Sequence, residues 1–147
     1  MKYVLLTGRI LFSLIFLMTI RNHFSAGAAA YAGSQGVPLA SIAVPLSGVI
    51  AILGGLSIAL GYKAKLGGLL IVLFLAPVTV MLHNFWMVSD PMAAGMQEAM
   101  FMKNLSLLGA ALMLSYFGSG PLSLDARRKS QPVRAYRKEQ VHEGVPA

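Results

Sequence analysis

The sequence contains no cysteine and few acidic residues. Among 147 residues, none is Cys and only five are Asp or Glu. The missing thiols exclude disulfides, thiolate metal sites, iron–sulfur clusters and cysteine nucleophiles. Glycine-rich phosphate loops, nucleophile elbows and zinc-binding helix motifs are also missing. We therefore expect a noncatalytic subunit rather than a self-contained enzyme, and any redox chemistry would need a borrowed cofactor or a partner protein.

Charge is scarce and apolar residues dominate. Charged residues make up 12% of the chain, hydrophobic residues 56%, and the mean hydropathy is +0.70. Four apolar runs cover residues 3–20, 39–60, 66–82 and 100–117. At 1.5 Å per residue each helix would span roughly 26 to 33 Å, enough to cross a bilayer. The runs lack period-two alternation, so we predict an all-α, integral membrane four-helix bundle over residues 1–120.

Basic residues set the predicted orientation. Lys2 precedes the first run, and Lys63 with Lys65 separates the second from the third, whereas the opposite loops carry only Arg21. By the positive-inside rule both termini face the cytoplasm, and in a bacterium the membrane would be the cytoplasmic (inner) one. Residues 121–147 then form a basic, flexible cytoplasmic tail. We expect this tail to contact anionic lipids rather than nucleic acid; its cluster comprises Arg127, Arg128, Lys129, Arg134, Arg137 and Lys138.

Arg9 lies inside the first apolar run. This run resembles a secretory signal peptide, but an arginine weakens such a segment's insertion, so we expect a retained helix. Arginine within a bilayer needs either a partner or a route to water. Arg9 could extend to the cytoplasmic headgroups, or it could form a structural ion pair with Asp125, which follows the fourth run on the same side.

Small residues recur every fourth position in the second run, at Ser47, Ala51, Gly55 and Ala59. Such a ridge lets a neighbouring helix backbone approach closely. We interpret it as a packing seam; the alternative is a groove for a ligand.

Polar and aromatic residues gather at the predicted outer end. His83 and Trp86 follow the third run, His23 lies in the first outer loop, and Lys103 and Asn104 open the fourth helix. Together with Glu98 they could form the mouth of a site for a quinone or a similar amphipathic ring. The alternatives are an ordinary aromatic belt and a Glu98–Lys103 ion pair.

Methionines also recur every fourth residue near this end. Met92, Met96 and Met100 would align on one helical face and could bind copper(I). Methionine is equally an ordinary apolar filler, and we predict no metal site.

In order and spacing, the chain resembles the DoxX family of small bacterial membrane proteins. The resemblance rests on Arg9, Gly36-Val37-Pro38, Gly54-Gly55, Leu60-Gly61, His83, Phe85-Trp86, Phe101, Lys103-Asn104, Gly118 to Pro121 and Ser123-Leu124-Asp125. It implies a four-helix membrane bundle. Some relatives are named as subunits of quinone-linked oxidoreductases or of redox-stress complexes. Many carry a glutamate in the second helix where Ala51 stands here, so an intramembrane acid suited to proton transfer is missing.

The leading hypothesis is an accessory membrane subunit of a quinone-linked oxidoreductase or redox-stress complex. It would use quinone as cofactor and would need a soluble or membrane redox partner protein. The alternative is a noncatalytic scaffold or small-lipid-binding protein. Both hypotheses are compatible with a homo-oligomer.

Overall fold

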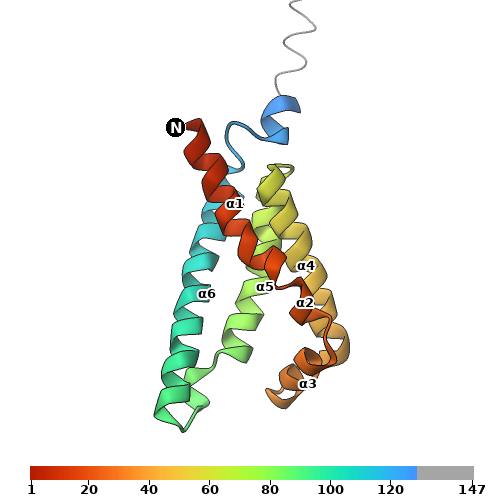
Figure 1. Ribbon diagram of the computed structural model, residues 1–147, viewed down its shortest axis with the longest axis vertical. Coiled ribbons are helices and arrows are strands. Elements are labelled where there is room, and N and C mark those ends of the chain that lie inside the picture. Colours follow the sequence, from red (N-terminus) through yellow and green to blue (C-terminus); the bar gives the residue numbers. More distant parts are fainter. Residues whose placement is uncertain (129–147) are drawn as a thin grey trace, which may run out of the picture.

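The computed structural model describes residues 1–128, and every regular element within them is helical. Four helical stretches are long and apolar enough to cross a membrane. They are α1 (Lys2–Met18) continued by the short α2 (Ile20–His23), α4 (Ala40–Leu60), α5 (Ala64–Leu82), and α6 (Pro91–Phe117) (Figure 1). The predicted all-α class with four membrane-length helices is therefore confirmed.

Two short helices occupy the segments predicted as the first and third loops. Helix α3 (Ala26–Ser34) follows Ser25, whose hydroxyl accepts a hydrogen bond from the Ala28 amide at 3.2 Å. A 3₁₀ turn, η1 (Phe85–Met87), follows α5. Helix α6 also begins at Pro91 rather than near residue 100. Asp90 caps it by accepting from the Ala93 amide at 2.7 Å, and Pro91 suits the first turn because its missing N–H would have no helical partner.

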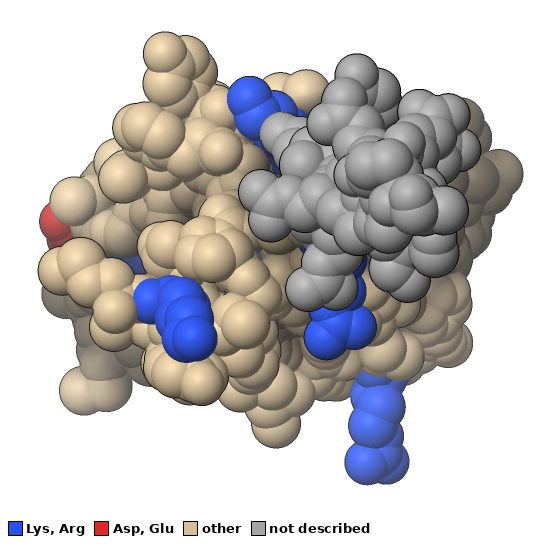
Figure 2. All heavy atoms as spheres, turned by 90° about the horizontal axis from the view of Figure 1, so that it is seen from above, with Lys and Arg blue, Asp and Glu red and all other residues tan. Residues whose placement is uncertain are grey.

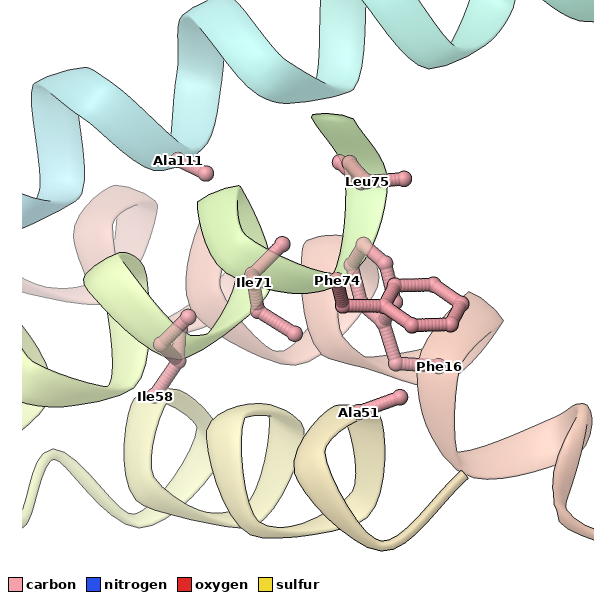
Figure 3. Packing of buried hydrophobic residues seen from close by; sticks show 7 residues of the cluster. All are labelled: Phe16, Ala51, Ile58, Ile71, Phe74, Leu75 and Ala111. Carbon is pink, nitrogen blue, oxygen red and sulfur yellow. The ribbon is translucent and has the colours of Figure 1, made fainter. Parts of the chain in front are cut away.

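Each long helix packs on its neighbour in the order α1, α4, α5, α6. The core between them is small and apolar (Figure 3). It consists of Phe16 from α1, Ala51 and Ile58 from α4, Ile71, Phe74 and Leu75 from α5, and Ala111 from α6. Most other large apolar side chains point outward, including Leu53, Leu73 and Met113. Outward-facing apolar side chains are expected where lipid surrounds the bundle.

Glycines bring neighbouring helices into close contact. A Cβ atom added to Gly68 of α5 would lie 2.8 Å from both the Ala111 carbonyl oxygen and the Ser115 amide nitrogen of α6. On the ridge predicted for α4, Ala51 is buried, and a Cβ at Gly55 would lie 3.4 Å from Phe16 Cβ of α1. Ala59 is half-buried, and Ser47 lines a cavity described below. Close backbone approach thus replaces the hydrophobic driving force that lipid does not supply.

The segment after α6 folds back over the end of the bundle that holds the N-terminus. Buried Arg9 donates from Nη1 to the Ser119 carbonyl at 2.6 Å and from Nη2 to the Leu122 carbonyl at 2.8 Å. These carbonyls pair the guanidinium within the protein. Ser119 Oγ in turn donates to Asp125 Oδ2 at 3.2 Å, so Ser119 bridges the two residues of the predicted ion pair.

The structure describes residues 121–128 of the tail predicted for residues 121–147. Residues 124–128 are helical, and the Asp125 amide donates to the Gly61 carbonyl at 2.9 Å, so this first part belongs to the folded unit. The rest of the predicted tail, residues 129–147, lies outside the described residues.

Candidate functional site

A cavity of about 250 Å³ lies at the end of the bundle opposite the N-terminus. Helices α1 to α6 all contribute to its lining, and most of the side chains are apolar, among them Phe16, Phe74 and Leu107. Four residues of the predicted site also line it: His23, His83, Lys103 and Asn104. The structure therefore brings these four together, from α2, the end of α5 and α6.

His23 is fixed from two sides. Its Nδ1 lies 3.0 Å from the Thr19 carbonyl oxygen, and its ring centre lies 5.5 Å from that of Phe74. Gly48 of α4 lies directly beside it, since a Cβ at that position would be 2.6 Å from His23 Cβ. The α4 backbone thus limits the imidazole to one position at the cavity wall.

His83 is held by a residue that the sequence analysis did not identify. Its Nδ1 lies 2.8 Å from Gln97 Oε1. Gln97 precedes Asn104 by seven residues, about two helical turns, so both lie on the same face of α6. The Asp90-Pro91 pair is a helix-start signal. A helix predicted from there would have placed Gln97 on the same face as Asn104.

Asn104 is the most deeply buried polar side chain of the predicted site. It is 5% exposed, and its side-chain amide forms no hydrogen bond within residues 1–128. Asn104 lines the cavity, so the two donors and one acceptor of its amide can bind a polar group there. A ligand with a hydroxyl or carbonyl group would satisfy this side chain.

Trp86 and Glu98 lie away from the cavity. The Trp86 side chain is 54% exposed, and its ring packs edge-on against Phe85 and Phe101 at 5.1 and 5.8 Å. Glu98 is exposed, and in the described part of the chain it forms no ion pair with Lys103. Lys103 Nζ instead lies 3.4 Å from Met100 Sδ. The six predicted residues thus form no single cluster.

A second cavity, also of about 250 Å³, adjoins the first. The two share Ala32, Val44, Ser47, Val78 and Leu82 in their walls. The remaining lining of the second cavity is apolar, from Val37, Pro38, Ala43, Pro77 and Met81. Two largely apolar cavities, one of which carries the polar side chains of the predicted site, therefore share a wall at this end. Within residues 1–128, no three His, Cys, Asp or Glu side chains come together as metal ligands.

Four membrane-length helices around a small interior define a multi-pass helical membrane protein. The chain belongs to the SURF4 family, whose model matches residues 1–131.

Curated relatives agree with this class. Inner membrane protein YphA of Escherichia coli is 31% identical over 102 residues, 69% of this chain and 71% of that protein. Inner membrane protein YqjF of the same organism is 30% identical over 122 residues, 82% and 88% of the two chains. The ER-derived vesicles protein ERV29 of Saccharomyces cerevisiae is 31% identical over 81 residues, 55% of this chain. The match spans about a quarter (26%) of that yeast protein. No solved structure matches.

The two bacterial relatives and the four spans confirm the predicted location, that of a multi-pass inner membrane protein.

Proposed function

We propose that this chain is an accessory membrane subunit of a quinone-linked redox system and that the cavity with His23, His83 and Asn104 holds a quinone or quinol ring. The observation that carries the proposal is the convergence of two imidazoles and a buried, unpartnered amide in an apolar chamber. A volume of about 250 Å³ lies just below the ~300 Å³ at which small-ligand pockets usually begin. It suits one ring rather than a larger cofactor.

The hydrogen bonds of the two histidines support this ligand class. A carbonyl oxygen accepts from Nδ1 of His23, and an amide oxygen accepts from Nδ1 of His83, so each neutral imidazole leaves Nε2 as an acceptor. A quinol hydroxyl could donate to such a nitrogen, and a protonated imidazole could donate to a quinone carbonyl. The bound group would supply two-electron chemistry, while the side chains would orient it and exchange its protons.

The adjoining apolar chamber supports a ligand with a tail. Membrane quinones carry a long hydrocarbon chain, and the wall between Ala32, Val44 and Val78 is common to both cavities. A ring beside His83 could therefore extend its chain past Ser47. The resemblance to the DoxX family, some of whose members are named as quinone-linked subunits, points in the same direction.

Quinone carried by the purified protein tests the proposal. The full chain is purified from bacterial membranes in mild detergent, and bound quinone is extracted and quantified per protein. We expect His83→Ala and Asn104→Leu each to reduce it about tenfold, because losing one hydrogen bond in a buried site costs on the order of 1–2 kcal/mol. Met102→Leu is the matched control: Met102 is exposed on α6 and does not line the cavity.

The alternative is a noncatalytic scaffold or small-lipid-binding protein, and the largely apolar second cavity favours it. In that case the wild-type protein would carry phospholipid and no quinone, and His83→Ala would leave the extract unchanged. Either result contradicts the redox proposal. Copurification of a soluble oxidoreductase with the wild-type chain would support it.

A further inference from the structure

The opposite end of the bundle contains a cavity with a different chemical character. It has a volume of about 680 Å³ and lies between the start of α5 and the segment after α6. Lys63, Lys65 and Arg128 line it. Figure 2 views this end of the molecule, where basic side chains stand out from the surface that the grey atoms leave visible.

One acidic residue lies in the same wall as these cations. Asp125 is the acidic residue among the lining residues, and its carboxylate is engaged inward. Oδ1 accepts from the Lys63 amide at 2.9 Å, and Oδ2 accepts from the Ala64 amide at 3.3 Å and from Ser119 Oγ at 3.2 Å. Buried Arg9 adds a compensating positive charge through the same Ser119. The wall therefore carries three cations and one carboxylate, an excess of positive charge.

Tyr62, outside the cavity lining, lies beside two of the three cations. The Arg128 guanidinium lies 4.7 Å from the centre of the Tyr62 ring, and Lys63 Nζ lies 5.7 Å from the same centre. The stem of Lys65 passes over Gly118, where an added Cβ would lie 3.4 Å from Lys65 Cε. Like charges in one cavity wall repel each other, and an anion bound in the cavity would lower that cost.

The rim of the cavity is apolar on the side of the bundle. Leu66 and Phe117 both line it, and their side chains are 55% and 72% exposed. They lie one turn inside α5 and at the last residue of α6, respectively, which is where the hydrocarbon of a bilayer would begin. The cavity therefore presents cations toward the headgroups and apolar side chains toward the acyl chains.

We infer that this cavity binds the phosphate of an anionic phospholipid, with Lys63, Lys65 and Arg128 around the headgroup and the acyl chains along Leu66 and Phe117. Basic pockets between membrane helices recognise such headgroups, and each nearby cation contributes to the attraction. Free phosphate offers the same charge, but it would not use the apolar rim. The inference is independent of the cavity lined by His23 and His83 and of the quinone proposal.

Lipid retention by the intact chain tests the inference. The purified full-length protein is incubated with phosphatidylglycerol or with phosphatidylcholine of identical acyl chains, and native mass spectrometry measures bound lipid. We expect preferential retention of phosphatidylglycerol and a loss of about tenfold in the Lys63→Gln/Lys65→Gln variant, because two attractions are removed. Arg128→Gln should lower retention independently. Circular dichroism and gel filtration verify that each variant is folded.

Lys2→Gln is the matched control, since it removes one positive charge at the same end from a residue that does not line the cavity. Its retention of phosphatidylglycerol should stay within about twofold of wild type. The inference fails if both lipids bind equally, or if Lys2→Gln loses as much as the double variant. It also fails if inorganic phosphate alone binds as tightly as the lipid.

Discussion

Arg9 shows how one charged residue can organise the end of a membrane bundle. A charge within a bilayer is costly, and Arg9, at 3% exposure, has lost almost all contact with water. Two backbone carbonyls of the segment after α6 accept from its guanidinium. Its Nε, and the Ser13 hydroxyl one turn further along α1, have no hydrogen-bond partner within residues 1–128. The site therefore depends on those carbonyls and on the nearby carboxylate of Asp125.

We predict that Arg9→Ala and Asp125→Ala destabilise the protein non-additively. Both residues meet Ser119, so either change disrupts the same network, and the double variant should lose less than the sum of the single ones. A coupling of about 0.5–3 kcal/mol is expected for residues that share a network. Unfolding in SDS titrations of the detergent-solubilised protein measures it.

Arg21→Ala provides the control for this cycle. Arg21 is exposed on α2, far along the chain from the Ser119 network, and its combination with Asp125→Ala should be additive. Additive effects for Arg9 and Asp125 as well would show that the two residues act separately.

At the scale of helices, hydropathy predicted the membrane-spanning segments. It did not predict the helix starts that capping residues set. The four membrane-length helices follow directly from the four apolar runs. The first turns of α6 were missed because this helix is less apolar, with a mean hydropathy of 1.3 against 2.2 for α4 and α5. Helix α3, rich in alanine and glycine, has no long apolar run. The Ser25 and Asp90 caps were the signals that could have located both starts.

Part of the site around His83 could be predicted from the sequence. His83, Lys103 and Asn104 could be grouped because a short connection makes α5 and α6 neighbours. The position of His23 depends on the short helix α2 and on the close contact with Gly48, neither of which the apolar pattern specifies. Gln97 was not identified because it lies in the first turns of α6, which were not predicted to be helical. The position of Trp86, away from the cavity, is set by ring packing with Phe85 and Phe101.

The close contact between α5 and α6 at Gly68 can be tested by a glycine-to-alanine substitution with a matched control. In Gly68→Ala the new methyl group would meet backbone atoms of Ala111 and Ser115 at 2.8 Å, and backbone cannot move aside as a side chain can. We expect a destabilisation of about 1–3 kcal/mol, typical of overpacking. Thermal unfolding in detergent, followed by the fluorescence of the single tryptophan, measures it.

Gly109→Ala makes the same chemical change on α6, where nothing lies within 4 Å of the added Cβ. It should be neutral or stabilising by up to about 1 kcal/mol, since alanine favours a helix over glycine. Equal effects of the two substitutions would mean that close approach at Gly68 does not limit the packing of α5 on α6.

On the scale of the whole molecule, the two ends of the bundle differ in chemistry. One end holds the N-terminus, the buried Arg9 network and the cavity with three cations. The other holds the largely apolar cavity with two histidines and the exposed methionines Met92 and Met96. A bilayer separates such ends, so the membrane orientation decides which compartment each cavity meets. The positive-inside rule predicts that the basic end faces the cytoplasm.

The absence of cysteine makes this orientation directly measurable. Single cysteines introduced as Gly27→Cys in α3 and Ser89→Cys before α6 lie at exposed positions of the predicted outer end. In intact bacterial cells a membrane-impermeant maleimide should label both. A cysteine appended after Ala147 should react only once the inner membrane is permeabilised, and the unmodified chain provides a background free of thiols. If the appended cysteine is labelled in intact cells and Ser89→Cys is protected, the topology is the reverse of the predicted one. The cation-lined cavity would then lie at the outer leaflet.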